Sequence, residues 1–210
     1  MGIVKSYIDS YMSKQYFRPS GLIGRRIGEL MIQQHAPETC WTVELIAARP
    51  TDHILELSCG AGRGLELIAA SVTEGLVVGL DFSRTMVASS RRRNAQAVRA
   101  GRVRVVYGKI EQLPFAEQSF DKVFGIHSLY FWTGPSSILR SILQVLKAGG
   151  TLTLTILPRE LWPGEDSEQC RIYAGEQVVE MMLAAGFSSA HIDRGPEQKQ
   201  FREIAVIGVK

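Results

Sequence analysis

A glycine-rich loop carries the clearest chemical signal in this chain. The apolar run 54–57 leads directly into Ser58-Cys59-Gly60-Ala61-Gly62, and a helical pattern follows. Glycine lets the backbone approach a ligand closely, and free N–H groups at the start of a helix attract anions. The loop predicts a ligand site, although a tight strand-to-helix turn without a ligand would look the same. A dinucleotide-binding loop would need a third glycine where this chain has Leu65.

An acidic residue ends the next predicted strand. Asp81 follows the apolar run 77–80 and comes 21 residues after Gly60, which is about the length of one crossover. A carboxylate in this place can accept hydrogen bonds from ribose hydroxyls. It can also cap the helix that begins near Ser83, and one side chain can do both.

Further polar and aromatic segments follow the later strands. One is 108–115, which ends in Leu-Pro-Phe, and another is the Ser-Phe-Asp turn at 119–121. A third, 127–132, begins with a histidine and contains Tyr130, Phe131 and Trp132. These aromatic residues can line a pocket for a substrate together with Tyr11 and Tyr16, or they can belong to the hydrophobic core. For Phe131 we expect a place in the core.

The elements that must position these residues alternate between strand and helix from position 51 onward. Strand-like runs occur at 53–57, 77–80, 103–107, 122–126, 151–157, 188–193 and 201–209. Helical patterns lie near 64–72, 83–99, 136–147 and 176–185. Alternation predicts a parallel sheet covered on both faces, and the last two runs, joined without a helix, should pair antiparallel. We therefore expect an α/β fold with a doubly wound, mostly parallel, seven-stranded sheet and one antiparallel strand.

The first fifty residues have a different character. Helical patterns run through the tyrosine-rich start, from about 22 to 35 and from about 38 to 48, with breaks at Pro19 and Pro37. We expect residues 1–50 to form a helical cap over one end of the sheet, although three simply packed helices fit the same pattern. Residues 51–210 are the expected core, and 1–210 the expected single domain.

In their order and spacing, these segments resemble the class I S-adenosylmethionine-dependent methyltransferases, over roughly residues 50–190. The similarity is greatest to the small-molecule branch that includes the quinone-biosynthesis enzymes. The family's acid-to-Gly-x-Gly run is matched by Glu56 to Gly62, and its second-strand acid by Asp81. Its Leu-Pro-Phe and Ser-Phe-Asp segments are matched at 113–115 and 119–121, and its late Leu-x-Ala-Gly-Phe at 183–187. The resemblance implies a Rossmann-like fold and S-adenosyl-L-methionine as cofactor.

The resemblance also implies roles for individual residues. The loop would lie against the methionine half of the cofactor, with Glu56 at its amino group and Asp81 at the ribose. Adenine would be held by Phe82, Met86, Ile110 and Glu111. The cofactor-binding residues implied are Glu56, Ser58, Gly60, Ala61, Gly62, Asp81, Phe82, Met86, Ile110, Glu111 and His127.

Two further expectations concern the methyl-acceptor end of the site and the edge of the adenine. His127 would lie near the methyl donor and is the best-placed base if the acceptor must lose a proton, with Tyr130 next. Lys109 departs from the family, because many relatives have an acid there that reads the adenine amino group. Lysine offers no acceptor, so either the backbone or Glu111 reads adenine, or the affinity for the cofactor is reduced.

Composition narrows the choice of partner and compartment. The formal charge of +3 is too small to argue for nucleic acid, and we expect the arginines between 91 and 104 to form a solvated face. No apolar run approaches the roughly 18–20 residues of a membrane span. The three cysteines are widely spaced, so no disulfide or metal site is expected, and the cytoplasm is the expected location.

The favoured function is methyl transfer to a small, apolar or aromatic molecule, aligned in line with the donor. An RNA or protein methyltransferase and a non-catalytic S-adenosylmethionine-binding protein are the alternatives. A nicotinamide-dependent oxidoreductase is disfavoured by Leu65. The sequence has no feature that fixes an oligomeric state.

Overall fold

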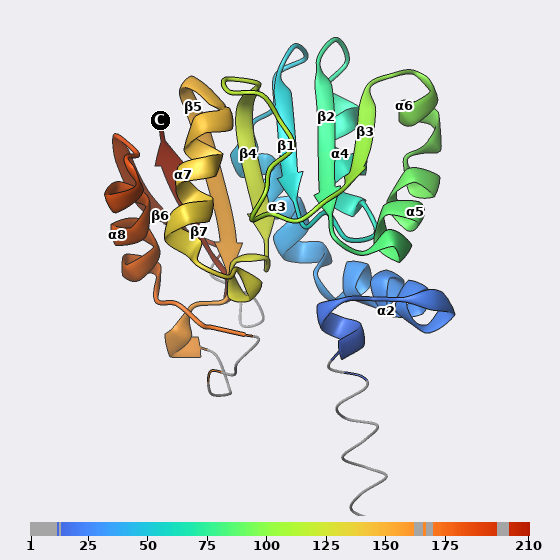
Figure 1. Cartoon of the computed structure of the whole chain (residues 1–210), viewed down its shortest axis with the longest axis horizontal. Coiled ribbons are helices and arrows are strands. Elements are labelled where there is room, and N and C mark those ends of the chain that lie inside the picture. The colour runs from blue at the N-terminus through green and yellow to red at the C-terminus, as the bar shows by residue number, and fades with distance from the viewer. Residues whose placement is uncertain (1–11, 13, 162–165, 167–169, 197–201) are drawn as a thin grey trace, which may run out of the picture.

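The computed structural model describes residues 12, 14–161, 166, 170–196 and 202–210. Across these residues one sheet has the strand order β3-β2-β1-β4-β5-β7-β6 (Figure 1). Its strands are β1 (His53–Leu57), β2 (Leu76–Asp81), β3 (Val103–Tyr107), β4 (Phe120–Ile126), β5 (Leu146–Ile156), β6 (Ser189–Arg194) and β7 (Ile204–Val209). Strand β7 pairs antiparallel with both β5 and β6, and the other pairs are parallel. The predicted Rossmann-like α/β sheet with one antiparallel strand is confirmed.

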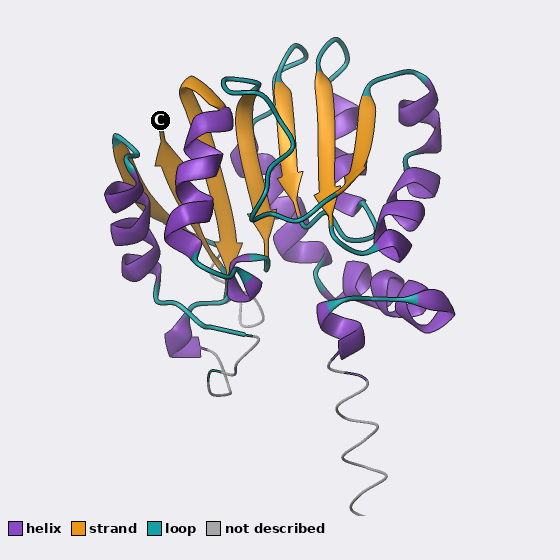
Figure 2. Ribbon diagram, viewed as in Figure 1, coloured by secondary structure: helices purple, strands orange, loops and turns teal. Residues whose placement is uncertain are grey.

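Helices cover both faces of this sheet (Figure 2). On β1, Leu55 and Leu57 belong to the core shared with α7 (Pro135–Val145) and α8 (Gly175–Ala185). Ile54 points the other way, into the core shared with α4 (Arg63–Ser71) and α5 (Arg84–Arg93). Alternate residues of a strand face opposite sides of a sheet, so apolar runs are needed where both sides are buried.

The connection from β3 to β4 contains no helix. Residues 108–119 cross the face of β1 and β2 as an extended segment (Figure 1). Ile110, Leu113 and Phe115 pack from this segment against the core that contains α7 and α8. The segment therefore completes the cover of the sheet and brings its first residues to the carboxyl ends of the strands.

Two predicted elements differ most from those in the structure. The pattern at 83–99 forms two helices, α5 and α6 (Ala95–Arg99), because buried Asn94 stands between them and donates from Nδ2 to the carbonyls of Gly62 and Ser90. Strand β5 begins at Leu146, five residues earlier than predicted, since Leu146 pairs with Phe120 before the register shifts.

The helices before the sheet divide between two places. Helix α2 (Gly21–Gln34) lies across the carboxyl ends of the strands and contacts α5 (Figure 1). Helix α3 (Ala36–Ile46) instead packs beside α4 on a face of the sheet, with Thr42 Oγ1 2.6 Å from Thr155 Oγ1. Of the predicted cap helices, α2 covers the end of the sheet and α3 does not. Most of the first, including Tyr11, lies outside the described residues, and its described positions, 12 and 14–17, are helical.

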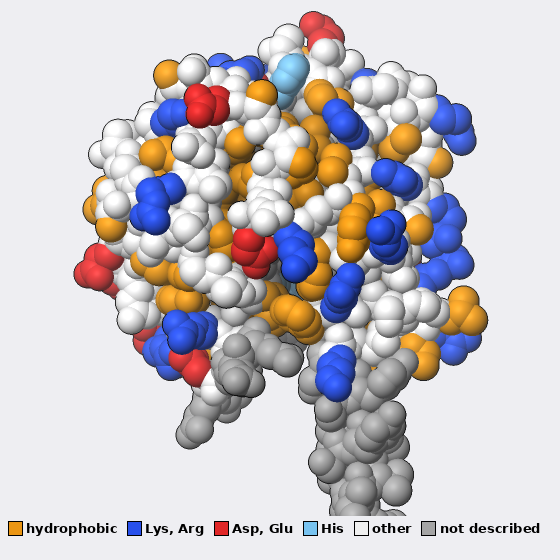
Figure 3. All heavy atoms as spheres, in the orientation of Figure 1, with side chains coloured by type: hydrophobic (Ala, Val, Ile, Leu, Met, Phe, Trp, Pro, Cys, Tyr) orange, Lys and Arg blue, Asp and Glu red, His pale blue; other side chains and the backbone are white. Residues whose placement is uncertain are grey.

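The arginine cluster is only partly a solvated face. Basic side chains gather along the side formed by α5, α6 and β3 (Figure 3). Arg91, Arg93 and Arg102 donate to the carbonyls of Val105, Ala61 and Ala69. Arg92, Arg99 and Arg104 are exposed, and Arg91 is exposed as well although it donates to Val105. Three of the six arginines therefore form hydrogen bonds with the backbone. No helix among the described residues is both long and apolar enough to cross a membrane.

Candidate functional site

A cavity of about 680 Å³ lies where the strand order reverses, between the ends of β1 and β4, with α2 over it. Open α/β sheets bind their ligands at such a switch point. Every residue predicted for cofactor binding or catalysis lines this one cavity: Glu56, Ser58, Gly60, Ala61, Gly62, Asp81, Phe82, Met86, Ile110, Glu111, His127 and Tyr130.

The loop after β1 has an unusual backbone. Ser58, Gly60 and Gly62 all have positive φ, at 53°, 51° and 84°. At Gly62 a Cβ atom would come within 2.2 Å of Ser90 Oγ, so a side chain is excluded there. At Gly60 a Cβ would meet nothing within 4 Å, because this residue faces the open cavity. The loop therefore presents bare backbone to a ligand.

Asp81 fixes this loop from the neighbouring strand. Its Oδ2 accepts the Gly60 N–H at 2.9 Å and its Oδ1 accepts the Ser83 N–H at 2.8 Å. The helix cap is Ser83 itself, whose Oγ accepts the Met86 N–H, so the predicted capping role of Asp81 is wrong. Burial raises the pKa of the Asp81 carboxyl to about 6. Its remaining lone pairs can accept from hydroxyl groups in the cavity.

Glu56 is buried with one oxygen unsatisfied. Burial, with a smaller contribution from the charge of Asp81, raises its pKa to about 8. Its Oε2 is buried and has no hydrogen-bond partner among the described residues. Gly64 makes room for this carboxyl, because a Cβ there would lie 2.3 Å from Oε1. Buried polar atoms are normally satisfied, so an ammonium group in the cavity fits this site.

Aromatic rings form the wall next to Asp81. The Phe17 ring meets the Phe82 ring edge to face at 5.4 Å, and the Arg18 guanidinium lies 5.5 Å from the centre of the Phe82 ring. Met86 is 1% exposed and packs beneath Gly28 of α2. Lys109 and Glu111 are exposed at the rim of the cavity. A flat group can lie against this wall with polar atoms at its edge.

The aromatic run after β4 divides differently from the prediction. Tyr130 and Trp132 are 4% and 5% exposed and belong to the core, although both reach the cavity. Phe131 is 38% exposed, and its ring meets Phe17 edge to face at 5.4 Å. The prediction that Phe131 is a core residue is wrong, because the short 3₁₀ turn Leu129–Phe131 directs its ring away from the core.

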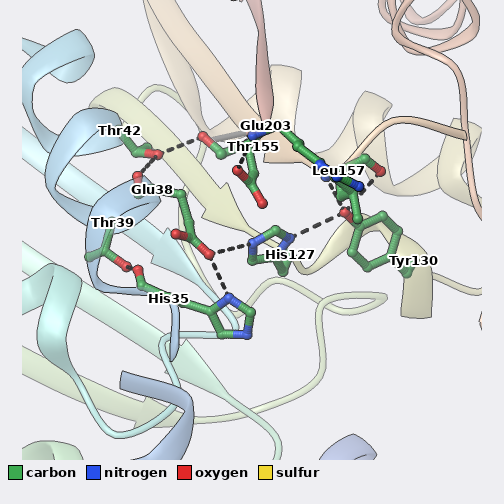
Figure 4. A network of polar contacts seen from close by, with 10 residues as sticks. His35, Glu38, Thr39, Thr42, His127, Tyr130, Thr155, Leu157 and Glu203 are labelled. Carbon is green, nitrogen blue, oxygen red and sulfur yellow. Dashed lines mark hydrogen bonds and ion pairs between the residues drawn. The ribbon is translucent and has the colours of Figure 1, made fainter. Parts of the chain in front are cut away.

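His127 is the centre of a polar network (Figure 4). Its φ of 49° is rare for a residue other than glycine. Its Nε2 lies 3.2 Å from Glu38 Oε1, and its Nδ1 lies 3.2 Å from the Tyr130 hydroxyl. His35 Nδ1 lies 2.6 Å from the same Glu38 oxygen. Both ring nitrogens of His127 therefore have protein neighbours.

The acidities in this network depend on burial and hydrogen bonding. Burial raises the pKa of Glu38, but hydrogen bonds with His127 and His35 outweigh it and bring the pKa down to about 2. Burial raises the pKa of Tyr130 well above its ordinary value, so its hydroxyl keeps its proton at neutral pH. Glu38 is thus an anion, and Tyr130 a neutral hydrogen-bonding group.

His35 and Glu38 were not predicted for the site. His35 lines the cavity, and Glu38 joins it to His127, which lies 89 residues further along the chain. The only local signal is their spacing of three, which places two polar side chains on one face at the start of a helix. Phe17, which contacts both Phe82 and Phe131, was also missed.

Fold and site together define a Rossmann-like α/β protein whose cavity is lined by a glycine loop and a second-strand acid, an arrangement typical of nucleoside-binding proteins. A family model described as a methyltransferase domain matches residues 55–154. The uncharacterized methyltransferase YdaC of Bacillus subtilis is 27% identical over 165 residues, 79% of this chain and 87% of that protein. The demethylmenaquinone methyltransferase of Symbiobacterium thermophilum is 35% identical over 114 residues, 52% of this chain and 45% of that protein.

Solved structures agree on the fold. An S-adenosylmethionine-dependent methyltransferase from Aquifex aeolicus superposes with a TM-score of 0.71 at 16% identity, covering 88% of this chain and 97% of its own. The methyltransferase partner of the Haloferax volcanii Trm112 activator gives 0.76 at 20% identity, covering 87% and 92%. The chain belongs to the class I S-adenosylmethionine-dependent methyltransferases, and S-adenosylmethionine is its cofactor. It spans about half the length of several curated relatives, including the fungal O-methyltransferase resE of Aspergillus sclerotiorum (54%).

Proposed function

We propose that this methyltransferase acts on a small, apolar or aromatic molecule and transfers the methyl group in line. The observation that carries the proposal is that the glycine loop and an aromatic wall line one cavity. The wall includes Tyr16, Phe17 and Phe131, and aromatic walls with few charges suit flat, apolar ligands. The names of the matched quinone and O-methyl relatives support the same substrate class.

The cofactor end of the cavity is assigned to the glycine loop and its neighbours. S-adenosylmethionine, when bound, supplies a methyl group already activated on a sulfonium. In the proposed arrangement Glu56 holds the ammonium group through its unpartnered Oε2, and Asp81 accepts from the ribose hydroxyls. Ser58, Gly60, Ala61 and Gly62 approach through their backbone. The adenine contacts proposed are Phe82, Met86, Ile110 and Glu111. Backbone groups would take the place of the acidic side chain that many relatives have where this chain has Lys109.

The acceptor end is assigned to His127, Tyr130 and Trp132. The Trp132 Nε1 is buried and has no acceptor among the described residues, so an acceptor molecule that carries an oxygen would satisfy it. We propose that His127 and the protonated Tyr130 hydroxyl orient that molecule. Alignment in a closed site can supply roughly 7–11 kcal/mol of a barrier. Because α2 and the sheet both line the cavity, we propose that residues 1–210 work as one domain.

Calorimetric titration with S-adenosylmethionine and S-adenosylhomocysteine tests the cofactor end. We expect micromolar binding that weakens at least ~10-fold in Asp81→Ala, because both the loop and the ribose lose their acceptor. Asp193→Ala is the matched control, since Asp193 is a partly exposed carboxylate on β6. Tighter binding of NAD than of either ligand would contradict the proposal.

A methyl-transfer assay with labelled cofactor tests the acceptor end. A panel of small phenols, quinols and apolar hydroxy compounds is compared with bulk RNA and with unfolded protein. We expect label in the small-molecule fraction, and less of it in Phe131→Ala. Label only in the RNA or protein fraction would replace the proposed substrate class, and cofactor binding with no transfer would favour a non-catalytic protein.

A further inference from the structure

Three potential metal ligands converge beside the cavity, in what we call the His–Glu–His cluster (His35, Glu38 and His127). One nitrogen of each imidazole and one oxygen of the carboxylate all lie within 4.8 Å of one another. Both imidazoles point at the same oxygen, Glu38 Oε1, as Figure 4 shows. Glu38 is 5% exposed, so this charge is almost completely withdrawn from water.

We propose that His35, Glu38 and His127 form a binding site for a divalent transition-metal ion. Two imidazoles and one carboxylate on one side of an ion are a ligand set used for zinc and for non-haem iron. Metal–ligand bonds of about 2.1 Å at tetrahedral or octahedral angles place ligand atoms about 3.0–3.4 Å apart. The 3.2 Å between His127 Nε2 and Glu38 Oε1 already meets this range, and the 2.6 Å contact of His35 must open slightly.

The surroundings of His127 can orient its ring toward a metal ion. The Tyr130 hydroxyl accepts the Leu157 N–H and lies 3.2 Å from the Leu157 carbonyl. When Tyr130 donates to that carbonyl, it accepts from Nδ1 of His127, and the Nε2 lone pair then faces the Glu38 carboxylate. In this tautomer Nε2 and Glu38 Oε1 are two electron-pair donors 3.2 Å apart, and a metal ion between them can bind both. The hydrogen bond from Nδ1 to Tyr130 is also the kind of outer contact that orients metal-binding histidines.

The backbone is shaped for this arrangement as well. His35 and Glu38 are three positions apart at the start of α3, so their side chains share a face. His127 reaches them from the end of β4 with a left-handed backbone of φ 49°. Such strain in a residue other than glycine is concentrated at functional sites. Imidazole ligands select first-row transition metals over magnesium and calcium, which prefer oxygen.

The site opens toward the acceptor end of the cavity. His35 and His127 both line it, so a metal held by three protein ligands keeps a position free on that side. That position suits an oxygen or nitrogen atom of the acceptor molecule. This role toward the acceptor rests on the proposed function, whereas binding of the metal does not.

Metal titration of the full chain, freed of any affinity tag and stripped with chelator, tests the proposal. We expect one equivalent of Zn²⁺ by calorimetry, and one equivalent of Co²⁺ with visible bands of nitrogen and oxygen ligation. His35→Ala, Glu38→Gln and His127→Ala should each weaken binding at least ~10-fold. His191→Ala is the matched control, because His191 is an exposed histidine outside the cluster. Its Nε2 lies 3.8 Å from a carboxylate oxygen of Asp193.

A second readout on the wild type removes any dependence on how the variants fold. The chain has four histidines, and nitrogen-15 NMR should show Zn²⁺ shifting the imidazoles of His35 and His127 but not those of His53 and His191. Asp81→Ala should lose the cofactor and keep the metal, which separates failure of this proposal from failure of the proposed function. Absence of binding, binding unchanged in all three variants, or a thiolate–cobalt band would overturn it.

Discussion

Glu56 and Asp81 are buried carboxyl groups with raised pKa values, unlike carboxylates on a protein surface. Burial raises their pKa values to about 8 and about 6, so near neutral pH Glu56 holds its proton when the cavity has no cation. A bound ammonium group favours the ionised form of Glu56. Cofactor binding should therefore expel a proton from Glu56, and its affinity should depend on pH.

At the residue scale, Glu56→Gln tests this coupling. In the wild type we expect affinity for S-adenosylhomocysteine to rise roughly 10-fold or more between about pH 6 and about pH 8.5, because the ionised fraction of Glu56 rises over that interval. In the variant, binding is weaker and the rise is largely lost. Calorimetry in two buffers of different ionisation enthalpy measures both affinity and proton release.

The matched control is Glu176→Gln, which removes an exposed carboxylate at the start of α8. It should bind with the affinity and pH dependence of the wild type. If Glu56→Gln retained the wild-type rise in affinity, the proton would have to come from another group and Glu56 would not contact the ammonium group.

At the scale of elements, two helices end in the same way with different residues. Helix α3 ends at Ala47 with φ 46°, and α8 ends at Gly186 with φ 109°. Both are left-handed, a conformation that costs roughly 1–2 kcal/mol for a residue with a Cβ. The protein therefore carries avoidable strain at Ala47 and avoids it at Gly186.

Exchanging these two residue types should change stability in opposite directions. We expect Ala47→Gly to raise the free energy of unfolding by up to ~1 kcal/mol. Gly186→Ala should lower it by ~1 kcal/mol or more, since its Cβ would also lie 3.1 Å from Leu143. Urea unfolding at equilibrium measures both, and equal signs for the two variants would show that helix-end strain does not control either effect.

The same scale shows what the sequence could predict of the fold. Runs such as 53–57 and 103–107 are apolar, short and bounded by turns, so their strands are found at the predicted residues. The break at Asn94 was not predictable, because it depends on a side chain that bonds to the distant Gly62 carbonyl. The early start of β5 at Leu146 depends likewise on pairing with Phe120.

At the scale of the molecule, the site was predictable where parallel strands define it. Gly60, Asp81 and His127 follow strands whose carboxyl ends share one edge, so topology alone brings them together. His35 and Glu38 precede the sheet, and no local pattern states where helices α2 and α3 will dock. Their contact with His127 is a property of the assembled fold.

The buried carboxylates also affect the stability of the whole chain. Both Glu56 and Asp81 have pKa values above those of an unfolded chain, so between about pH 4 and about pH 8 the folded state binds more protons than the unfolded state. Their stabilising contribution is complete below that window and is lost as pH rises through the folded pKa values. Groups whose pKa is lowered, such as Asp121 and Asp166, change the pH dependence of stability only below about pH 5, because above it they are ionised in both the folded and the unfolded state.

The ligand-free protein should therefore unfold more easily at about pH 8.5 than at about pH 5.5, by more than ~1 kcal/mol in urea unfolding. Glu56→Gln should lose much of this slope, since a neutral amide has no proton to release, and should be the more stable protein at the higher pH. Saturating S-adenosylhomocysteine should largely remove the trend in the wild type, because Glu56 is then ionised both in the complex and in the unfolded chain, and unfolding releases no proton from it across this window. Ligand at 100 times Kd also adds ~2.7 kcal/mol to the free energy of unfolding. If the free energy of unfolding of the ligand-free wild type instead rose between about pH 5.5 and about pH 8.5, Glu56 and Asp81 would have to be hydrated and ionised in the folded state. Proton release from Glu56 on cofactor binding would then be contradicted as well.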